Sequence, residues 1–267
     1  MIEPCFITIE MSEDFEEAIR LGAEAGVWTV HLRSGLWGRN VEQITQTDVG
    51  YMKDILATYG VRVGVILSPF GKCNIEDADE VQRHMEILAR MIELAHSFDT
   101  CLVRTFTFRR PEYEEYEPSR LDEYLPKIVE TLSPAVKMAE AEDIVMCFET
   151  VGSTLARSAQ EARRVVDALD SSPAVALIWE IDVAWRAGEL PSQGYPYVRG
   201  YVQDVHIKAN PDRLIDPVGT SSDTYEDAFR ALLADGYNGF ATIEHWGSAE
   251  GTLRGIQQLN SILNRIK

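Results

Sequence analysis

The sequence predicts an α/β protein of the (β/α)8 barrel class, a TIM barrel, folded as a single domain over residues 1–267. The length suits one such barrel, which typically takes roughly 250 residues. Eight short apolar runs alternate with amphipathic segments to the end of the chain, without a linker, repeat or low-complexity stretch. A doubly wound open sheet is the alternative, but no G-x-G-x-x-G segment marks the crevice that such a sheet uses.

Eight apolar runs are expected to form the strands. They are 5–10, 27–33, 61–68, 101–108, 144–150, 176–182, 202–208 and 239–245. Between them, apolar residues recur in steps of three and four, as one face of a helix requires. One such series is Val81, Met85, Leu88, Ile92 and Ala95, and the last is Leu253, Ile256, Leu259, Leu263 and Ile266.

Residues typical of helix ends separate these segments. Capping boxes, which satisfy the free N–H groups of a first turn, are expected at 77–80, 158–161 and 223–226. Gly26, Gly60 and Gly236 each follow a helical stretch, where glycine readily takes the left-handed conformation. Two places are less regular. Pro134 predicts a kink or a break in its helix, and residues 188–201 offer only a short helix.

Composition excludes several classes of protein. The chain is 45% hydrophobic, which is enough to fill a large core. Its formal net charge of −18 argues against a nucleic-acid partner, because binding to phosphates depends on clustered Lys and Arg. No apolar run approaches the roughly 18 residues of a membrane span, and the first residues lack the pattern of a signal peptide. We therefore expect a cytoplasmic protein with no membrane partner; a homo-oligomer is left open.

The cysteines point to no metal or disulfide framework. Cys5, Cys73, Cys101 and Cys147 are far apart and form no C-x-x-C pair. Three of them fall on or beside expected strands. We therefore expect reduced, mostly buried thiols.

Four apolar runs in the second half of the chain carry a metal-ligating side chain near the end. These side chains are Glu149, Asp182, His206 and Glu244. A buried carboxylate or imidazole costs several kcal/mol without a partner, so four strands that end this way need a common cause. In a (β/α)8 barrel these strands would be consecutive neighbours, with their carboxyl ends at the active face. We therefore predict that the four residues bind one divalent cation. A mixed O/N set suits Mn²⁺ first or Co²⁺, with Mg²⁺ and Zn²⁺ as alternatives.

In these segments the chain resembles the xylose-isomerase-like TIM barrels, the superfamily of sugar (phosphate) isomerases and epimerases. The matching pieces are Phe148-Glu149, Ile181-Asp182, His206-Ile207-Lys208 and Ile243-Glu244. The resemblance implies that the Glu, Asp, His and Glu bind one divalent metal. It also implies that Glu149 and Glu244 flank the substrate and act as catalytic acid and base.

The chain departs from the resemblance at three positions. Trp185 stands where many members have a histidine that contacts a substrate hydroxyl, three residues after the metal-binding Asp. Ala209 replaces an Asp after the His-x-Lys piece, and Thr150 replaces an Asn after the first glutamate. These changes leave the four predicted ligands intact. They bear on the substrate instead.

Other polar residues are candidates for supporting roles. Lys208 shares the face of His206 nearer the barrel mouth, where it would polarise a substrate oxygen or balance carboxylates. Glu180 and Asp204 lie two residues before predicted ligands, hence deeper in the barrel, and need buried partners; Arg104 and His31 are the basic candidates. We expect these four to form a structural network. His245 follows Glu244 and should face away from it unless the strand has already ended there; a supporting structural role is expected for it.

Several residues in the loops after the strands are candidates to contact the substrate. Arg213 follows strand 202–208, and the resemblance implies a substrate-contacting arginine there. Trp37, Arg39, Phe70, Trp185, Trp246 and His31 are further candidates. Aromatic side chains beside sugars are common, as are aromatic side chains that only pack a loop. The acidic stretch 110–118 reads as a solvated loop or a lid.

The resemblance implies an isomerase or epimerase of a small sugar or keto-sugar that abstracts a proton next to a carbonyl and forms an enediolate. A dehydratase of an inosose- or dehydroshikimate-like substrate is the alternative, and Trp185 favours it somewhat. A sugar-binding barrel without turnover is a third hypothesis. Without a glycine-rich phosphate cradle, an unphosphorylated carbohydrate-like substrate is expected.

Overall fold

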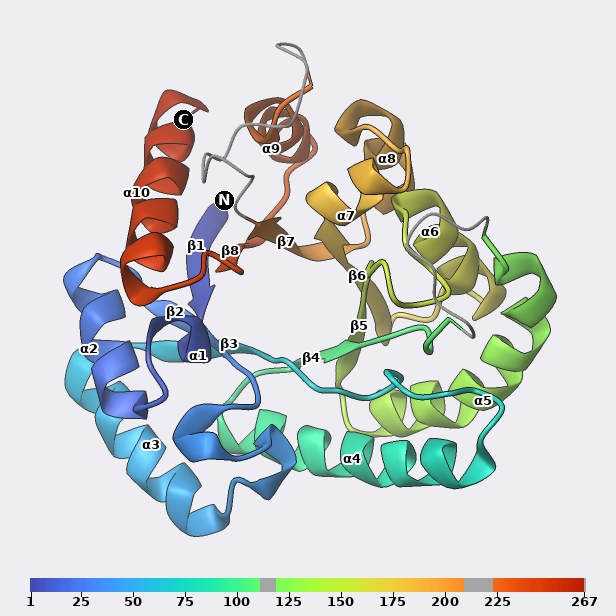
Figure 1. The fold of residues 1–267 in the computed structure, drawn as a ribbon, viewed down its shortest axis with the longest axis horizontal. Coiled ribbons are helices and arrows are strands. Elements are labelled where there is room, and N and C mark those ends of the chain that lie inside the picture. Colours follow the sequence, from blue (N-terminus) through green and yellow to red (C-terminus); the bar gives the residue numbers. More distant parts are fainter. Residues whose placement is uncertain (111–118, 209–222, 267) are drawn as a thin grey trace. The chain divides into compact units, whose positions relative to one another are not determined.

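The computed structural model describes residues 1–110, 119–208 and 223–266, and helices alternate with strands along them (Figure 1). Eight strands in these residues follow one another in the sheet order β1 to β8 of a closed barrel. They are β1 (Ile2–Ile7), β2 (Thr29–Leu32), β3 (Arg62–Ile66), β4 (Leu102–Thr105), β5 (Val145–Glu149), β6 (Val175–Glu180), β7 (Val202–Lys208) and β8 (Gly239–Glu244).

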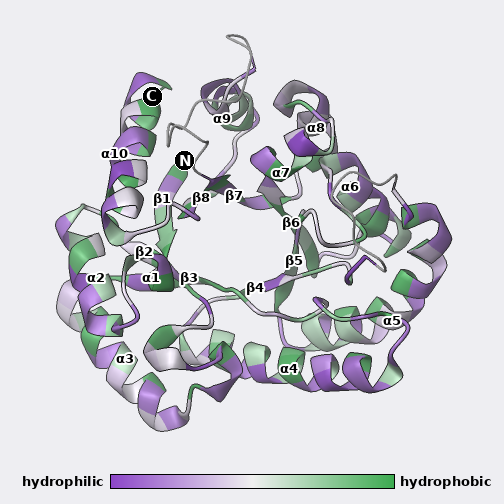
Figure 2. Cartoon of the chain, viewed as in Figure 1, coloured by the Kyte–Doolittle hydropathy of each residue, from purple (hydrophilic) through white to green (hydrophobic). Residues whose placement is uncertain are grey.

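The helices in the described residues are amphipathic, as the sequence predicts. Figure 2 shows hydrophobic and hydrophilic residues alternating around α5 and α10. The α-helices are α1 (Thr8–Met11), α2 (Phe15–Glu24), α3 (Gln46–Tyr59), α4 (Ala78–Ser97), α5 (Leu121–Ala141), α6 (Ala159–Ala168), α7 (Ile181–Arg186), α8 (Pro191–Val198), α9 (Tyr225–Ala234) and α10 (Ala249–Ile266). Two short 3-10 helices are η1 (Leu36–Gly38) and η2 (Val41–Gln43). No helix of the described ranges has the length and apolar character that crossing a membrane requires.

One compact unit, called unit 1 here, comprises Met1–Leu67, Leu94–Thr100 and the described residues from Asp204 onward. Its strands pair in parallel in the order β7-β8-β1-β2-β3. Lys208 lies opposite Glu244, and His206 lies opposite Thr242. The register therefore aligns the carboxyl ends of β7 and β8.

The second compact unit, unit 2, comprises Ser68–Glu93 and the described residues between Cys101 and Gln203. Its strands pair in parallel in the order β4-β5-β6. Arg104 lies opposite Cys147, and Glu149 lies opposite Ile178. Because residues two apart on a strand share a face, Arg104 and Glu149 project from the same side of this sheet.

Local sequence signals explain most helix ends. Ser158 forms the expected capping box with Glu161, but the box before α9 uses Thr224 and Asp227, one residue later than predicted. Gly26, Gly60 and Gly236 take the expected positive φ, at 77°, 67° and 79°. Three cysteines are buried, and all four are free thiols, as expected.

Three element predictions are wrong in part. The strand predicted at 5–10 ends at Ile7, because Thr8–Met11 turns into α1. The strand predicted at 176–182 ends at Glu180, and Asp182 lies in the first turn of α7 instead. No break occurs at Pro134, since α5 runs continuously from Leu121 to Ala141. The short helix expected within 188–201 is present as α8.

Candidate metal centre

The carboxyl ends of β7 and β8 bring together three polar side chains that the sequence singles out. His206 Nδ1 lies 3.5 Å from Glu244 Oε2, and Lys208 Nζ lies 3.6 Å from the same oxygen. His206 is fully buried and Glu244 is 2% exposed. Glu244 Oε2 accepts no hydrogen bond in the described part of the chain. A buried carboxylate oxygen and an imidazole nitrogen held side by side are ligands of the kind that Mn²⁺, Co²⁺ or Zn²⁺ bind.

The other oxygen of Glu244 is held by an arginine that the sequence analysis missed. Arg33, which directly follows β2, donates from Nη1 to Glu244 Oε1 at 2.9 Å. Its Nη2 donates to the carboxylate of Glu10 in α1. Two signals could have found this pair. Phe6-Ile7-Thr8-Ile9-Glu10 is another apolar run ending in a carboxylate, and Arg33 stands two residues beyond His31.

Positive groups dominate the electrostatics of Glu244. Burial disfavours its ionised form, but the adjacent His206 and Lys208 outweigh this effect and hold the pKa of the carboxyl well below its usual value. Glu244 is therefore a carboxylate at neutral pH, the form that binds a cation or accepts a proton. His245, whose side chain is 56% exposed, has a positive φ of 58° and lies 3.6 Å from both Glu10 and Glu244. The strand ends at Glu244, which is the condition under which His245 is not expected to face away from it.

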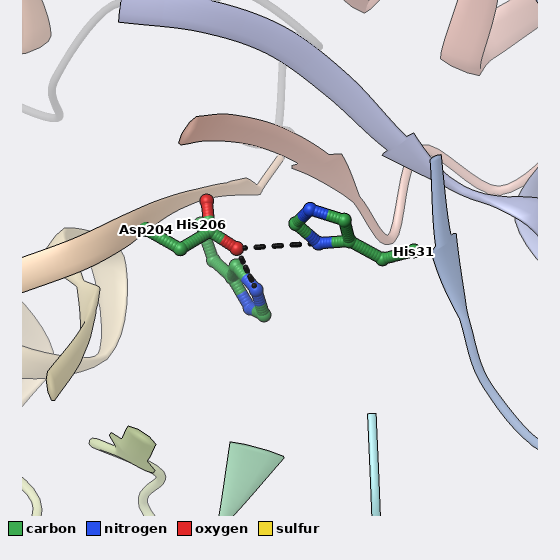
Figure 3. A group of neighbouring side chains, drawn as sticks. All are labelled: His31, Asp204 and His206. Atoms are coloured by element: carbon green, nitrogen blue, oxygen red, sulfur yellow. Dashed lines mark hydrogen bonds and ion pairs between the residues drawn. The ribbon is translucent and has the colours of Figure 1, made fainter. Parts of the chain in front are cut away.

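A buried polar cluster occupies the interior face of unit 1, next to His206 (Figure 3). Asp204 Oδ2 lies 3.0 Å from His206 Nε2 and 3.3 Å from His31 Nδ1. Thr242 Oγ1 donates to Asp204 Oδ1 at 2.8 Å. Burial disfavours ionisation of Asp204, but His206, His31 and Thr242 outweigh it and lower the pKa of this carboxyl. His31, one of the two basic residues expected as partners for Glu180 and Asp204, therefore lies beside Asp204.

In unit 2 the predicted ligand Glu149 ends β5 and is 4% exposed. Arg104 Nη1 on β4 donates to Glu149 Oε2 at 2.8 Å, and its Nε donates to the carbonyl of Ser68 at 3.3 Å. The sequence offered Arg104 as a partner for the deeper carboxylates, Glu180 and Asp204. In the structure Arg104 pairs with Glu149 instead. It lies opposite Cys147, which is two residues before Glu149, so Arg104 and Glu149 project from the same face.

The predicted ligand Asp182 follows β6 directly, in the first turn of α7. Its carboxylate lies 3.1 Å from Nε of Arg186, one helical turn later. Trp185 lies on the same short helix and is half-buried. Glu180, the last residue of β6, is fully buried, and its backbone N–H donates to Thr150 Oγ1 at 3.0 Å. The carboxylate that the sequence assigned to the strand end is therefore displaced onto a helix.

The predicted substrate contacts lie in different surroundings. His31 is fully buried in the Asp204 cluster, and Lys208 is beside Glu244. Trp37 packs near Phe15 and Tyr51, at ring centroid distances of 6.2 and 6.3 Å, with Arg39 over its ring. Trp246 is buried and donates to the carbonyl of Ile207 at 3.0 Å. Arg213, and residues 111–118 of the acidic stretch 110–118, lie outside the described residues.

Comparison with known families identifies the fold. A family described as xylose isomerase-like TIM barrel matches residues 15–262. The chain belongs to this family. The predicted (β/α)8 class and the resemblance noted in the sequence are both confirmed. No curated protein matches the chain by sequence.

Solved structures with the same fold share little sequence with this chain. D-psicose 3-epimerase from Clostridium cellulolyticum H10, solved with D-tagatose, is 14% identical, with a TM-score of 0.75 over 99% of this chain and 98% of that one. A xylose isomerase-like TIM barrel protein from Mycobacterium smegmatis, in complex with magnesium, is 19% identical, with a TM-score of 0.72 over 98% and 97%. A probable 3-DHS dehydratase from Bacillus anthracis is 15% identical, with a TM-score of 0.73 over 99% and 100%. At these identities the likeness is one of fold.

Proposed function

We propose that this protein is a divalent-metal-dependent isomerase or epimerase of a small sugar or keto-sugar, formed as one domain over residues 1–267. The observation that carries the proposal is the pair His206 and Glu244. Both are buried at aligned strand ends, and Glu244 Oε2 lies 3.5 Å from His206 Nδ1 without a hydrogen bond from the described residues. A buried carboxylate oxygen without a hydrogen bond, next to an imidazole nitrogen, is suited to binding a divalent cation.

The residues that would hold the cation are Glu149, Asp182, His206 and Glu244. Three carboxylates and one imidazole fit Mn²⁺ as the first expectation, with Co²⁺, Mg²⁺ and Zn²⁺ as alternatives. Each unit offers groups of the kind that bind such a cation. His206 and Glu244 present a nitrogen and an oxygen to one another in unit 1, and Glu149 is a buried strand-end carboxylate in unit 2. A bound divalent ion would supply polarisation of a substrate carbonyl and its neighbouring hydroxyl.

The chain's own residues then divide the remaining work. Glu149 and Glu244 are the candidates to remove a carbon-bound proton next to the carbonyl and to return one elsewhere. Arg104 and Arg33 each hold one oxygen of a glutamate, at 2.8 and 2.9 Å, and so fix the direction of the other. Lys208, whose Nζ lies 3.6 Å from Glu244 Oε2, is the candidate to donate to a substrate oxygen.

Metal analysis and isotope exchange test this proposal. Purified protein should contain about one divalent ion per chain, and Asp182→Ala should lower that content sharply. Incubation with a panel of unphosphorylated keto-sugars in D₂O should exchange a carbon-bound hydrogen for deuterium while the substrate otherwise keeps its mass. Protein that binds none of the four metals would refute the site.

A dehydratase of an inosose- or dehydroshikimate-like substrate is the second candidate. Trp185 favours it, because this half-buried residue stands on α7 where many family members place a hydroxyl-binding histidine. Both candidates begin with the same proton abstraction, and they differ in whether hydroxide then leaves. Loss of 18 mass units from a substrate in the panel, a water molecule, would assign the lyase. Metal binding without exchange for any compound would leave a sugar-binding barrel.

A further inference from the structure

The Asp204 cluster brings three hydrogen-bond donors to one buried carboxylate. Two imidazole nitrogens, from His206 on β7 and His31 on β2, face one oxygen of Asp204 (Figure 3). The hydroxyl of Thr242 on β8 donates to the other oxygen. All four side chains are fully buried. The register explains the convergence, since His206 lies opposite Thr242, while Asp204 lies two residues before His206 on the same face.

The chemistry of these groups fixes where their hydrogens lie. An ionised carboxylate only accepts hydrogen bonds, so the His206 nitrogen that lies 3.0 Å from Asp204 must carry the hydrogen. That nitrogen is Nε2. In a neutral ring the hydrogen at Nε2 leaves a lone pair on Nδ1, and Nδ1 is the atom that lies 3.5 Å from Glu244 Oε2.

His31 completes the arrangement. Its Nδ1 lies 3.3 Å from both Asp204 Oδ2 and Thr242 Oγ1. The single hydroxyl hydrogen of Thr242 is directed to Asp204, so His31 Nδ1 faces two acceptors and donates. Asp204 is thereby held from two sides and cannot turn away from His206.

We infer that Asp204 is a positioning residue, which fixes His206 with its hydrogen on Nε2 so that the lone pair of Nδ1 faces the cation site. This inference rests on the proposed function, because it concerns the same site. Groups that orient a metal-binding histidine through its second nitrogen typically contribute 10- to 100-fold to metal affinity.

The cluster is not a second cation site. The ligand atoms of His31, Asp204 and His206 lie within 4.8 Å of one another, as those of a metal site would. Both carboxylate oxygens of Asp204 already accept hydrogen bonds, however, and a cation would have to displace the N–H hydrogens that face them. We therefore expect one ion per chain rather than two.

Substitution of Asp204→Asn tests the role, because the amide keeps the shape of the carboxylate but turns one acceptor into a donor. A neutral amide oxygen accepts the Nε2 hydrogen of His206 less strongly than a carboxylate does, so the ring is held less firmly with its Nδ1 lone pair toward the cation site. We expect the affinity for Mn²⁺, measured by calorimetry, to fall by about 10- to 100-fold. Thr242→Val removes a donor without touching His206, so it should cause a smaller fall.

Asp48→Asn is the matched control. It makes the same chemical change in the same unit, where Asp48 pairs with Arg39 and caps α3. Its affinity for Mn²⁺ should equal that of the wild type. An equal loss in Asp48→Asn and Asp204→Asn would show a general effect of lost carboxylates and overturn the inference.

A second measurement needs no variant, and so holds even if Asp204→Asn fails to fold. Long-range ¹H–¹⁵N correlation spectra of the metal-free, ¹⁵N-histidine-labelled protein distinguish protonated from unprotonated ring nitrogens. The spectra are recorded at a pH where the ring of His206 is neutral, which is the form that binds a cation. There His206 should carry its hydrogen on Nε2, and His31 should carry one on Nδ1. The His206 signals are assigned as those missing in His206→Gln. A hydrogen on Nδ1 of neutral His206 would overturn the inference. Failure of the wild type to bind any of the four metals would instead refute the proposed function, whichever nitrogen carries the hydrogen.

Discussion

The two glutamates proposed for proton transfer lie in different units and in different electrostatic surroundings. Glu149 in unit 2 receives a hydrogen bond from Arg104, which is itself buried on the neighbouring strand. Glu244 in unit 1 contacts Arg33, His206, Lys208 and His245, and Arg33 and His245 also contact Glu10.

The two glutamates differ in the positive groups around them: Glu149 pairs with a buried arginine, whereas several basic side chains surround Glu244. Removal of one member of a buried ion pair is costly, because the other charge stays buried and loses its nearest opposite charge. A carboxylate with several partly exposed cations around it loses less when one is removed, because the others and water remain. Glu149 should thus be sensitive to its arginine, and Glu244 more tolerant.

The largest effect is expected when either glutamate is neutralised. Glu149→Gln and Glu244→Gln should each lower kcat on the substrate found in the D₂O panel by about 10²- to 10⁴-fold, the usual contribution of a positioned acid or base. The kcat of each variant and the rate of deuterium exchange check this. A variant that retains wild-type exchange would show that the substituted glutamate takes no part in the proton transfer.

Loss of Arg104 should have the next largest effect. Arg104→Met leaves Glu149 buried without its guanidinium, which should lower the free energy of unfolding by about 3–5 kcal/mol. Urea titration followed by circular dichroism measures this. The double variant Arg104→Met/Glu149→Gln should recover part of the loss, because it removes the buried charge as well. A double variant that is no more stable than Arg104→Met would mean that Arg104 acts mainly through packing.

Loss of Arg33 should cost less. Its side chain is 22% exposed, and Glu244 keeps Lys208 and His206 when Arg33→Met removes the guanidinium. We expect a decrease of about 1–2 kcal/mol in the free energy of unfolding, the range of a hydrogen bond to a charged group. A decrease equal to that of Arg104→Met, under the same urea titration, would contradict the contrast drawn between the two glutamates.

The exposed pair Arg39–Asp48 provides the smallest effect and a pH test. Hydrogen bonds from Arg39 and Thr45 lower the pKa of Asp48 below its usual value of 3.8. A lowered carboxyl pKa stabilises the fold above the unfolded value, and this stabilisation disappears as the pH falls through the folded value. Asp48→Asn should therefore cost about 1 kcal/mol at pH 7. The difference from wild type should shrink below pH 3.8; a constant difference would assign the loss to shape rather than charge.

Local patterns predicted much of the fold because they depend on neighbours in sequence. Strand 202–208 has the bounds of β7, and the Ser158 capping box and the glycines after the helices are where the residues predicted them. The errors are local too. Ile181 and Asp182 read as a strand end, yet α7 begins there, because an apolar run does not say where a strand gives way to a helix.

The candidate site was likewise predictable only in part. The sequence by itself identified Glu149, Asp182, His206 and Glu244 as candidates. Each stands at the end of an apolar run, where a carboxylate or imidazole is easily recognised in the sequence. It also indicated that Asp204 and Glu180 need buried partners and named His31 and Arg104 as the basic candidates. Only the tertiary structure decided that Arg33 and Glu10 join Glu244, and that Arg104 belongs to Glu149. Such partners are brought together by strand register across tens to hundreds of residues, and no spacing along the chain records which cation a buried carboxylate will meet.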